Sequence, residues 1–253
     1  NTSLGADTLN EAVGGGTDSL TLTGSTNDVA INLALTGNQT INSNLTLNMT
    51  SAQAENVTGG DGNDTLTGNN SNNTLTGGSG NDTLDGGAGN DTLTGGDGND
   101  VLKTGSGVDT IDAGAGDDEI VVTGTNEAGD TADGGAGVNV FKFSVGATGI
   151  LSLTSNGEDT LDFSLFGNSV TIDLGNSSQQ DVGGGLLLTL NGWFKNVIGS
   201  GSDDQITGND VDNNLDGGNG NDTLHGGNGS DTLNGNAGDD QLDGGSGTDS
   251  LDG

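Results

Sequence analysis

The chain contains thirteen nine-residue units in two uninterrupted runs, and this repeat limits the possible folds more than any other feature of the sequence. Seven units cover residues 59–121 and six cover residues 199–252. With some substitutions the units read Gly-Gly-x-Gly-x-Asp-x-(Leu or Ile)-x, and residues 77–85 (GGSGNDTLD) match at every position. A short fixed period is typical of a solenoid, because one unit buries its apolar side only when neighbouring units stack on it.

The last three positions of the unit predict the strands. The eighth position is aliphatic in all thirteen units, and it is flanked mostly by polar residues. This alternation is typical of a short half-buried strand. Two units would make one flattened coil, since a strand on one face must be followed by a turn and a strand that returns along the other face. The predicted fold is all-β: a parallel β-roll or β-solenoid with turns on alternate edges.

The sixth position predicts metal ligands in those turns. It is a carboxylate in eleven of the thirteen units: Asp64, Asp82, Asp91, Asp100, Asp109, Asp118, Asp204, Asp222, Asp231, Asp240 and Asp249. Successive coils lie roughly 4.8 Å apart, so each aspartate would lie near the aspartate two units later. Two carboxylates about 5 Å apart repel by roughly 3 kcal/mol at an effective dielectric constant near 20, and a divalent cation between them reverses the sign. Calcium prefers such oxygen ligands.

Glycines at the second and fourth positions complete the predicted calcium turns. Glycine tolerates positive φ, so the backbone can turn its carbonyl oxygens towards a cation. The predicted glycines are Gly60, Gly62, Gly78, Gly80, Gly87, Gly89, Gly96, Gly98, Gly218, Gly220, Gly227 and Gly229. Pairs such as Asp82 with Asp100 predict about nine calcium ions. Asn73 and Asn213 replace the aspartate in the second unit of each run. We interpret them as weakened calcium sites rather than as residues with a separate role.

The composition agrees with calcium-dependent folding. The chain has 37 acidic and three basic residues, for a formal net charge of −34, so nucleic acid and anionic membrane surfaces are excluded as expected partners. Only 28% of residues are hydrophobic and 52 are glycine, so we expect the calcium-free chain to be largely disordered. Calcium binding energy would then be folding energy. The sequence has no cysteine and no apolar stretch long enough to span a membrane.

The nonapeptides resemble the RTX (repeats-in-toxin) family of hemolysin-type calcium-binding repeats, and residues 196–204 (NVIGSGSDD) look like the start of the roll in serralysin-type proteases and mannuronan epimerase modules. The resemblance implies a parallel β-roll that folds on external calcium, with the sixth-position aspartates and turn carbonyls as ligands. It also implies type I secretion from a bacterium, to the outside or to the cell surface. The catalytic domains of those relatives are missing, and no His-Glu-x-x-His zinc motif occurs. We expect no enzymatic activity.

A longer repeat organises the chain. Residues 57–85 resemble 197–225, and residues 29–33 resemble 170–174. We therefore expect one module used twice: a strand-rich N-terminal segment (1–58), a first calcium roll (59–121), a strand-rich connector (122–198) and a second calcium roll (199–253). We favour two rolls in one elongated body. Because the chain begins and ends within repetitive sequence, we expect it to be part of a longer protein.

The connector holds all six aromatic residues, between positions 141 and 194. We interpret them as a hydrophobic cap over the solenoid ends, with a carbohydrate platform as the alternative, and we expect residues 134–142 to close the first roll. The single histidine, His225, is expected to be a solvated strand residue.

Three functions remain open at this stage. The first is a structural and secretion module, for example of an adhesin. The second is a non-catalytic polysaccharide-binding module of an epimerase-like enzyme. The third is an ice-binding region like that of an RTX adhesin, for which Asn81, Asn90 and Asn99 repeat at the fifth position.

Overall fold

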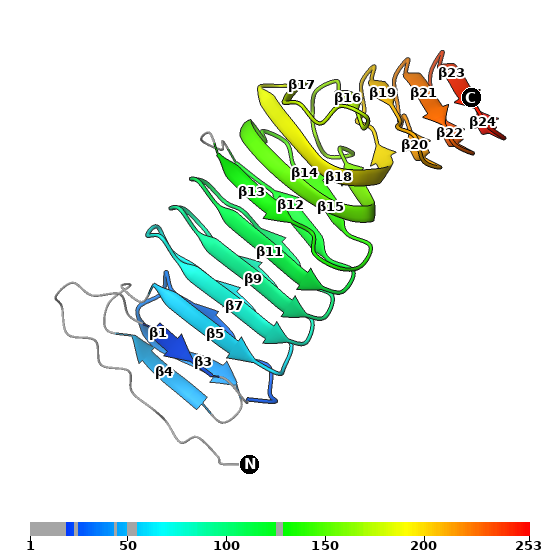
Figure 1. Ribbon diagram of the computed structural model, residues 1–253. Coiled ribbons are helices and arrows are strands. Elements are labelled where there is room, and N and C mark those ends of the chain that lie inside the picture. Colours follow the sequence, from blue (N-terminus) through cyan, green and yellow to red (C-terminus); the bar gives the residue numbers. More distant parts are fainter. Residues whose placement is uncertain (1–18, 23–24, 43–44, 50–54, 125–128) are drawn as a thin grey trace.

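The structure, a computed structural model, describes residues 19–22, 25–42, 45–49, 55–124 and 129–253. Figure 1 shows short strands stacked like rungs from β1 (Ser19–Thr21) at one end to β24 (Ser250–Asp252) at the other. The described residues contain strands and turns but no helix, and hence no helix that could cross a membrane. The predicted all-β parallel solenoid is confirmed.

The strands form two rows, one on each face of the flattened coil. The first row stacks β1, β5 (Asn56–Gly60), β7 (Thr74–Ser79), β9 (Thr92–Asp97), β11 (Thr110–Ala115), β13 (Asp130–Asp133) and the first parts of β15 (Gly149–Asp162) and β18 (Leu186–Ile198). The second row stacks β2 (Ala30–Asn32), β6 (Thr65–Thr67), β8 (Thr83–Asp85), β10 (Val101–Lys103), β12 (Glu119–Val122), β14 (Val140–Phe143), the last parts of β15 and β18, β20 (Asn214–Asp216), β22 (Thr232–Asn234) and β24.

The remaining strands lie outside these two rows. In the C-terminal half, β16 (Thr171–Asp173), β19 (Gln205–Thr207), β21 (Thr223–Asn228) and β23 (Gln241–Ser246) form a separate parallel sheet. Two antiparallel pairs interrupt the parallel pattern: β3 (Gly37–Asn42) with β4 (Leu45–Met49), and β17 (Gln180–Gly183) with the first part of β18.

The core follows the eighth position of the repeat. Leu66 pairs with Leu84, and Leu84 pairs with Leu102, so each eighth-position residue pairs with its equivalent two units later. These three side chains are fully buried. Leu75, Leu93 and Ile111 form the equivalent column in the other row. Two aliphatic columns therefore fill the inside of the coil, one from each row, and this is why two repeat units make one turn.

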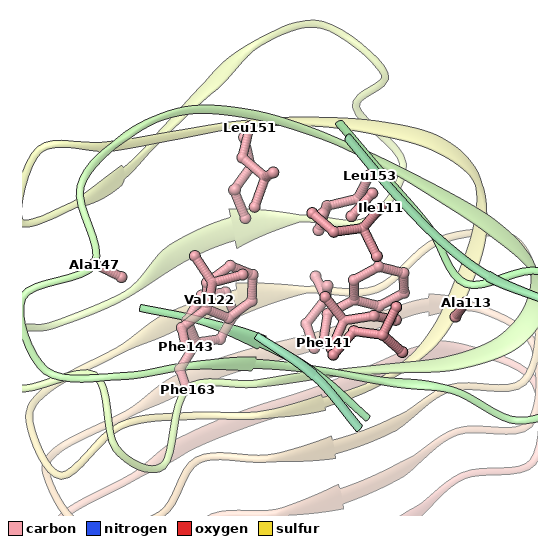
Figure 2. Close-up of a cluster of buried hydrophobic side chains, with 14 of the residues drawn as sticks. Ile111, Ala113, Val122, Phe141, Phe143, Ala147, Leu151, Leu153 and Phe163 are labelled. Carbon is pink, nitrogen blue, oxygen red and sulfur yellow. The ribbon is translucent and has the colours of Figure 1, made fainter. Parts of the chain in front are cut away.

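The connector continues the solenoid instead of closing it. Strand β14 pairs with β12 on one side and with β15 on the other, so the prediction that residues 134–142 close the first roll is wrong. All five phenylalanines are fully buried, and Phe143 stacks on Phe163 with ring centroids 4.5 Å apart. Figure 2 shows Phe141, Phe143 and Phe163 packed among aliphatic side chains inside the coil. They are a core and not a cap, because strands continue beyond them in both directions.

The two runs of repeats belong to one continuous sheet. Strand β15 pairs with β18, and β18 pairs with β20 of the second run, so the favoured arrangement of two separate rolls is wrong. The longer sequence repeat is nevertheless real in three dimensions. Leu20 of β1 pairs with Val57 of β5, and Leu161 of β15 pairs with Val197 of β18 in the same way.

Candidate metal-binding turns

The sixth-position residues form ladders along the edges of the solenoid. The backbone amide of each donates a hydrogen bond to Oδ1 of the sixth-position residue one coil later: Asp64 to Asp82 at 2.7 Å and Asp91 to Asp109 at 2.9 Å, for example. The first half has one ladder through Asp64, Asp82, Asp100, Asp118, Asn139 and Asp159 and a second through Asn73, Asp91, Asp109 and Asp130. The second half has ladders through Asp204, Asp222 and Asp240 and through Asn213, Asp231 and Asp249.

The second carboxylate oxygen of most ladder residues has no protein partner. Ten buried Oδ2 atoms accept no hydrogen bond within the described part of the chain: those of Asp82, Asp91, Asp100, Asp109, Asp118, Asp130, Asp159, Asp222, Asp231 and Asp240. Buried carboxylate oxygens are almost always paired, because an unpaired one costs several kcal/mol. The orphaned oxygens therefore fit a cation at the turns, which would supply the missing partner.

Glycine makes room for these carboxylates at the first position of eleven of the thirteen units, and Thr104 and Ala113 take its place in the other two. A Cβ atom added at Gly77 would lie 2.1 Å from Oδ2 of Asp82, and one added at Gly95 would lie 2.3 Å from Oδ2 of Asp100. A side chain at Gly77 or Gly95 would therefore displace the carboxylate. The first position thus shapes the cradle, and the sequence interpretation, which stressed the second and fourth positions, missed it.

The predicted second- and fourth-position glycines mostly adopt the conformation that only glycine favours. Gly78 and Gly80 have φ values of 125° and 116°. The same left-handed region holds Gly87, Gly89, Gly96, Gly98, Gly218, Gly220, Gly227 and Gly229. Gly60 and Gly62, in the first unit, lie outside it. The first unit therefore has a different turn from the units that stack on it.

Burial makes the ladder carboxyls hard to ionise without a cation. It raises the pKa of Asp91 and Asp100 to about 7, with repulsion from nearby aspartates adding to the shift. It also raises the pKa of Asp82, Asp109 and Asp130 to about 6. In the second half, burial raises the pKa of Asp204, Asp222 and Asp231 in the same direction. A neighbouring positive charge would offset this cost.

Side chains alone do not complete a metal site. The described residues contain no group of three or more His, Cys, Asp or Glu side chains close enough to hold one ion. Calcium takes six to eight oxygen ligands, and backbone carbonyls are among its common ligands. Ladder carboxylates together with turn carbonyls supply a donor set of the right kind, since the glycine turns of adjacent coils approach closely. A Cβ at Gly96 would lie only 2.0 Å from the carbonyl oxygen of Gly78.

Three ladder members were missed by the sequence analysis. Asp130, Asn139 and Asp159 are buried and continue the ladders into the connector. Their spacings from the preceding members are 21, 21 and 20 residues, because the coils there contain short insertions. A signal was present: Asn139 occupies the sixth position of residues 134–142, and Asp159 precedes a Thr-Leu pair as in the regular units.

The fifth-position asparagines form another ladder at the surface of the turns. Oδ1 of Asn81 accepts the backbone amide of Asn99 at 2.9 Å, and Oδ1 of Asn90 accepts that of Val108 at 3.0 Å. Oδ1 of Asn99 accepts the amide of Asp117 in turn. The recurrence of asparagine at this position is thus explained by contacts between coils, which weakens the case for ice binding.

His225 lies on β21 as a partly exposed strand residue. Its Nδ1 atom is 3.2 Å from Oδ2 of Asp243 on β23, and both side chains are substantially exposed. This environment agrees with the predicted solvated position.

A family model described as the RTX calcium-binding nonapeptide repeat matches the chain in four copies, at residues 58–93, 85–120, 198–233 and 216–251. The matched ranges coincide with the two runs of nonapeptides. No curated protein matches the chain.

Proposed function

We propose that this chain, whose nonapeptides are RTX calcium-binding repeats, is a non-catalytic structural region of a secreted or cell-surface bacterial protein that folds on external calcium. RTX repeats imply calcium binding and are typical of secreted bacterial proteins. The observation that supports calcium-driven folding most strongly is the set of ten buried aspartate oxygens without a hydrogen-bond partner among the described residues. Without a cation these oxygens oppose folding.

The expected calcium affinity and the charge support an external compartment. Extracellular calcium modules have dissociation constants of about 10⁻⁴ to 10⁻³ M, far above cytosolic calcium, so the chain would stay unfolded until export. About nine divalent ions would neutralise roughly half of the formal charge of −34. We propose type I secretion as the route, because an unfolded calcium-free chain suits passage through a narrow export channel.

A calcium titration tests this proposal. Far-ultraviolet circular dichroism and calorimetry should show a cooperative gain of β-structure at sub-millimolar to millimolar calcium. Magnesium should not replace calcium, because it demands near-octahedral geometry and gives up its waters reluctantly. A chain that is fully folded in chelator and binds few ions would contradict the proposal.

Trp193 supports a second candidate function, binding of a neutral polysaccharide. It is the only tryptophan in the chain, and it is 53% exposed. It lies between a hollow of about 590 Å³ that Asp210 and Asn228 help to line and another that Lys195 helps to line. Aromatic rings offer an apolar face to sugar rings, and the paired Asp210 and Asn228 side chains offer hydrogen bonds to hydroxyls. The net charge opposes an acidic polymer.

Tryptophan fluorescence gives a direct test of the second candidate. A neutral polysaccharide such as dextran or xylan should change the emission of the calcium-loaded chain, whereas alginate should not. Trp193→Ala should abolish binding in an isotherm while the calcium-induced fold is retained. Equal weak binding by the wild type and by this variant would rule the site out.

A further inference from the structure

The first residue of each ladder, which we call its first rung, differs from the residues that follow it. In the first half the two ladders start at Asp64 and Asn73, and in the second half they start at Asp204 and Asn213. All four residues are buried, yet none of them has a side-chain atom among the buried unpartnered atoms of the described residues. Protein groups therefore satisfy the side-chain hydrogen bonds of the first rung.

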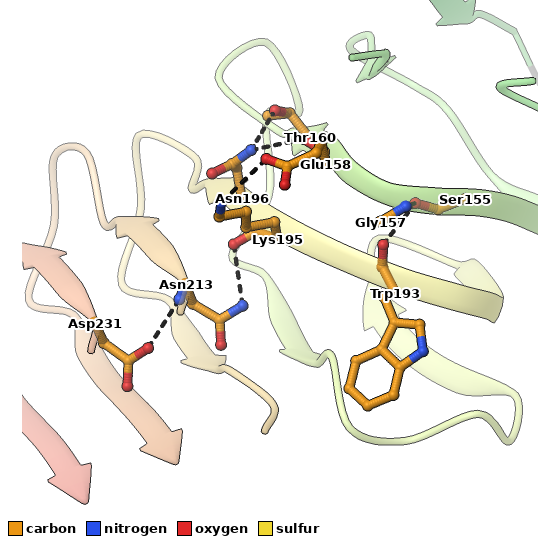
Figure 3. A network of polar contacts seen from close by, with 9 residues as sticks. All are labelled: Ser155, Gly157, Glu158, Thr160, Trp193, Lys195, Asn196, Asn213 and Asp231. Carbon is orange, nitrogen blue, oxygen red and sulfur yellow. Dashed lines mark hydrogen bonds and ion pairs between the residues drawn. The ribbon is translucent and has the colours of Figure 1, made fainter. Parts of the chain in front are cut away.

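The two asparagines are bound in the same way in the two halves of the chain. Oδ1 of Asn73 accepts the amide of Asn69 at 2.8 Å, and its Nδ2 donates to the carbonyl oxygen of Glu55 at 3.1 Å. Asn213 repeats both bonds, to Asn209 at 2.8 Å and to Lys195 at 3.1 Å. Figure 3 shows the Asn213 amide directed at the Lys195 carbonyl, while its backbone amide is bound to Asp231 of the next rung.

The partner carbonyls explain why the residue is asparagine. Glu55 and Lys195 lie two repeat lengths earlier, at the ladder position of the coil below, where no aspartate stands. The Glu55 carbonyl also accepts the Thr74 amide at 2.9 Å, so Asn73 supplies it with a second hydrogen bond. An ionised carboxylate has no donor for such a bond. An aspartate here would place an oxygen against an oxygen in a buried position.

The first rung of the other edge is saturated by backbone amides. Asp64 accepts from Val29 at 2.9 Å and from Gly60 at 2.7 Å. Asp204 accepts from Val170 at 2.7 Å and from Ser200 at 2.6 Å. Both carboxylates therefore use both oxygens in bonds to the chain, unlike the ten orphaned aspartates above them. The start of a ladder is thus closed by protein groups on both edges of the solenoid.

We propose that Asn73 and Asn213 are calcium-independent caps that start the ladders on their edge, and that calcium binding on that edge begins at the next rung, Asp91 and Asp231. This assignment replaces the interpretation of the two asparagines as weakened calcium sites. It rests on the proposed calcium-dependent folding. It also identifies the two places where a ladder on this edge starts without an ion.

The substitution Asn213→Asp distinguishes a cap from a weakened site, because it preserves shape and changes only the donor and the charge. For a cap, the variant loses the bond to Lys195, so the calcium midpoint of folding should rise about twofold while the number of bound ions stays the same. The midpoint is read by circular dichroism and the ion number by equilibrium dialysis. A lower midpoint with an additional ion, or no change in either quantity, would overturn the proposal.

Three further variants control the experiment. Asn219→Asp adds the same charge at an exposed position of the neighbouring unit and should leave both quantities nearly unchanged. Asp231→Asn, at the next rung, should lower the ion number. Asn73→Asp should reproduce the Asn213→Asp result in the first half. If the wild-type chain binds no calcium, the proposed function fails; if it binds calcium and Asn213→Asp gains an ion, only the cap assignment fails.

Discussion

The backbone amide of Asp82 donates a hydrogen bond of 2.7 Å to Oδ1 of Asp100, one full coil later. The other oxygen of the same carboxylate, Oδ2 of Asp100, is buried and has no hydrogen-bond partner among the described residues. One oxygen therefore bonds to the neighbouring coil, and the other is available to a cation. This division recurs along the ladders, so the proposed calcium sites would be coupled to the stacking of the solenoid.

Replacing one ladder carboxylate should weaken calcium-dependent folding. Asp100→Asn keeps an oxygen for the Asp82 amide but removes the charge, so the folded state at fixed calcium should lose about 1–3 kcal/mol. Urea unfolding at several calcium concentrations measures this loss. Asp112→Asn removes the same charge from an exposed strand position and should change stability by less than about 0.5 kcal/mol. Equal effects of the two variants would show that general charge, and not the ladder site, controls folding.

A methyl group at the first position of a unit should disrupt the cradle. Gly77→Ala would place Cβ 2.1 Å from Oδ2 of Asp82. The carboxylate must move, so we expect a loss of about 1–3 kcal/mol in calcium and a higher calcium midpoint. Gly201→Ala is the matched control, because no atom lies within 4 Å of its added Cβ. Calorimetry of both variants in saturating calcium makes the comparison, and a neutral Gly77→Ala would contradict the geometry.

Acid should partly replace calcium. Burial raises the pKa of Asp91 and Asp100 from the ordinary value of 3.8 to about 7. The folded chain then holds these protons more tightly than the unfolded chain, so their contribution to stability is present below about pH 4 and is lost as the pH rises through about 7. The calcium-free chain should therefore show more β-structure at about pH 5 than at about pH 8. Circular dichroism in metal-free buffer checks this, and the opposite trend would contradict it.

Each aliphatic side chain should contribute to the free energy of unfolding in proportion to its burial. Leu84 is fully buried between Leu66 and Leu102, so Leu84→Ala should cost about 2–5 kcal/mol in saturating calcium. Leu35 is 54% exposed, and Leu35→Ala should cost much less. Thermal unfolding of the two variants gives the difference. Similar losses would mean that calcium, rather than the leucine column, supplies nearly all of the stability.

The regular units could be predicted almost completely from the sequence. The nine-residue period places an aliphatic residue inside and a carboxylate in the turn, and the structure buries Leu84 and stacks Asp82 with Asp100 as this period requires. The prediction succeeded because each unit carries the same residue types at the same positions, so that the structure of one unit predicts that of the next.

The connector could not be predicted in the same way. Insertions change the ladder spacing to 21 and 20 residues, so counting in nines loses Asp130, Asn139 and Asp159. Aromatic residues replace leucine in this part of the column, and buried Phe141 and Phe143 resemble a terminal cap as long as only their clustering is known. The hydrogen bonds of Asn73 and Asn213 go to carbonyls of the preceding coil, which no local pattern reveals.

The most direct test of the central claim is an anomalous diffraction map from crystals of the calcium-loaded chain. Peaks should lie in the turns next to the Oδ2 atoms of ladder aspartates such as Asp82, Asp100 and Asp222, and no peak should lie at Asn73 or Asn213. An ordered solenoid whose turns carry no anomalous peaks would contradict the account, because its buried carboxylates would then have to be stabilised by something other than calcium.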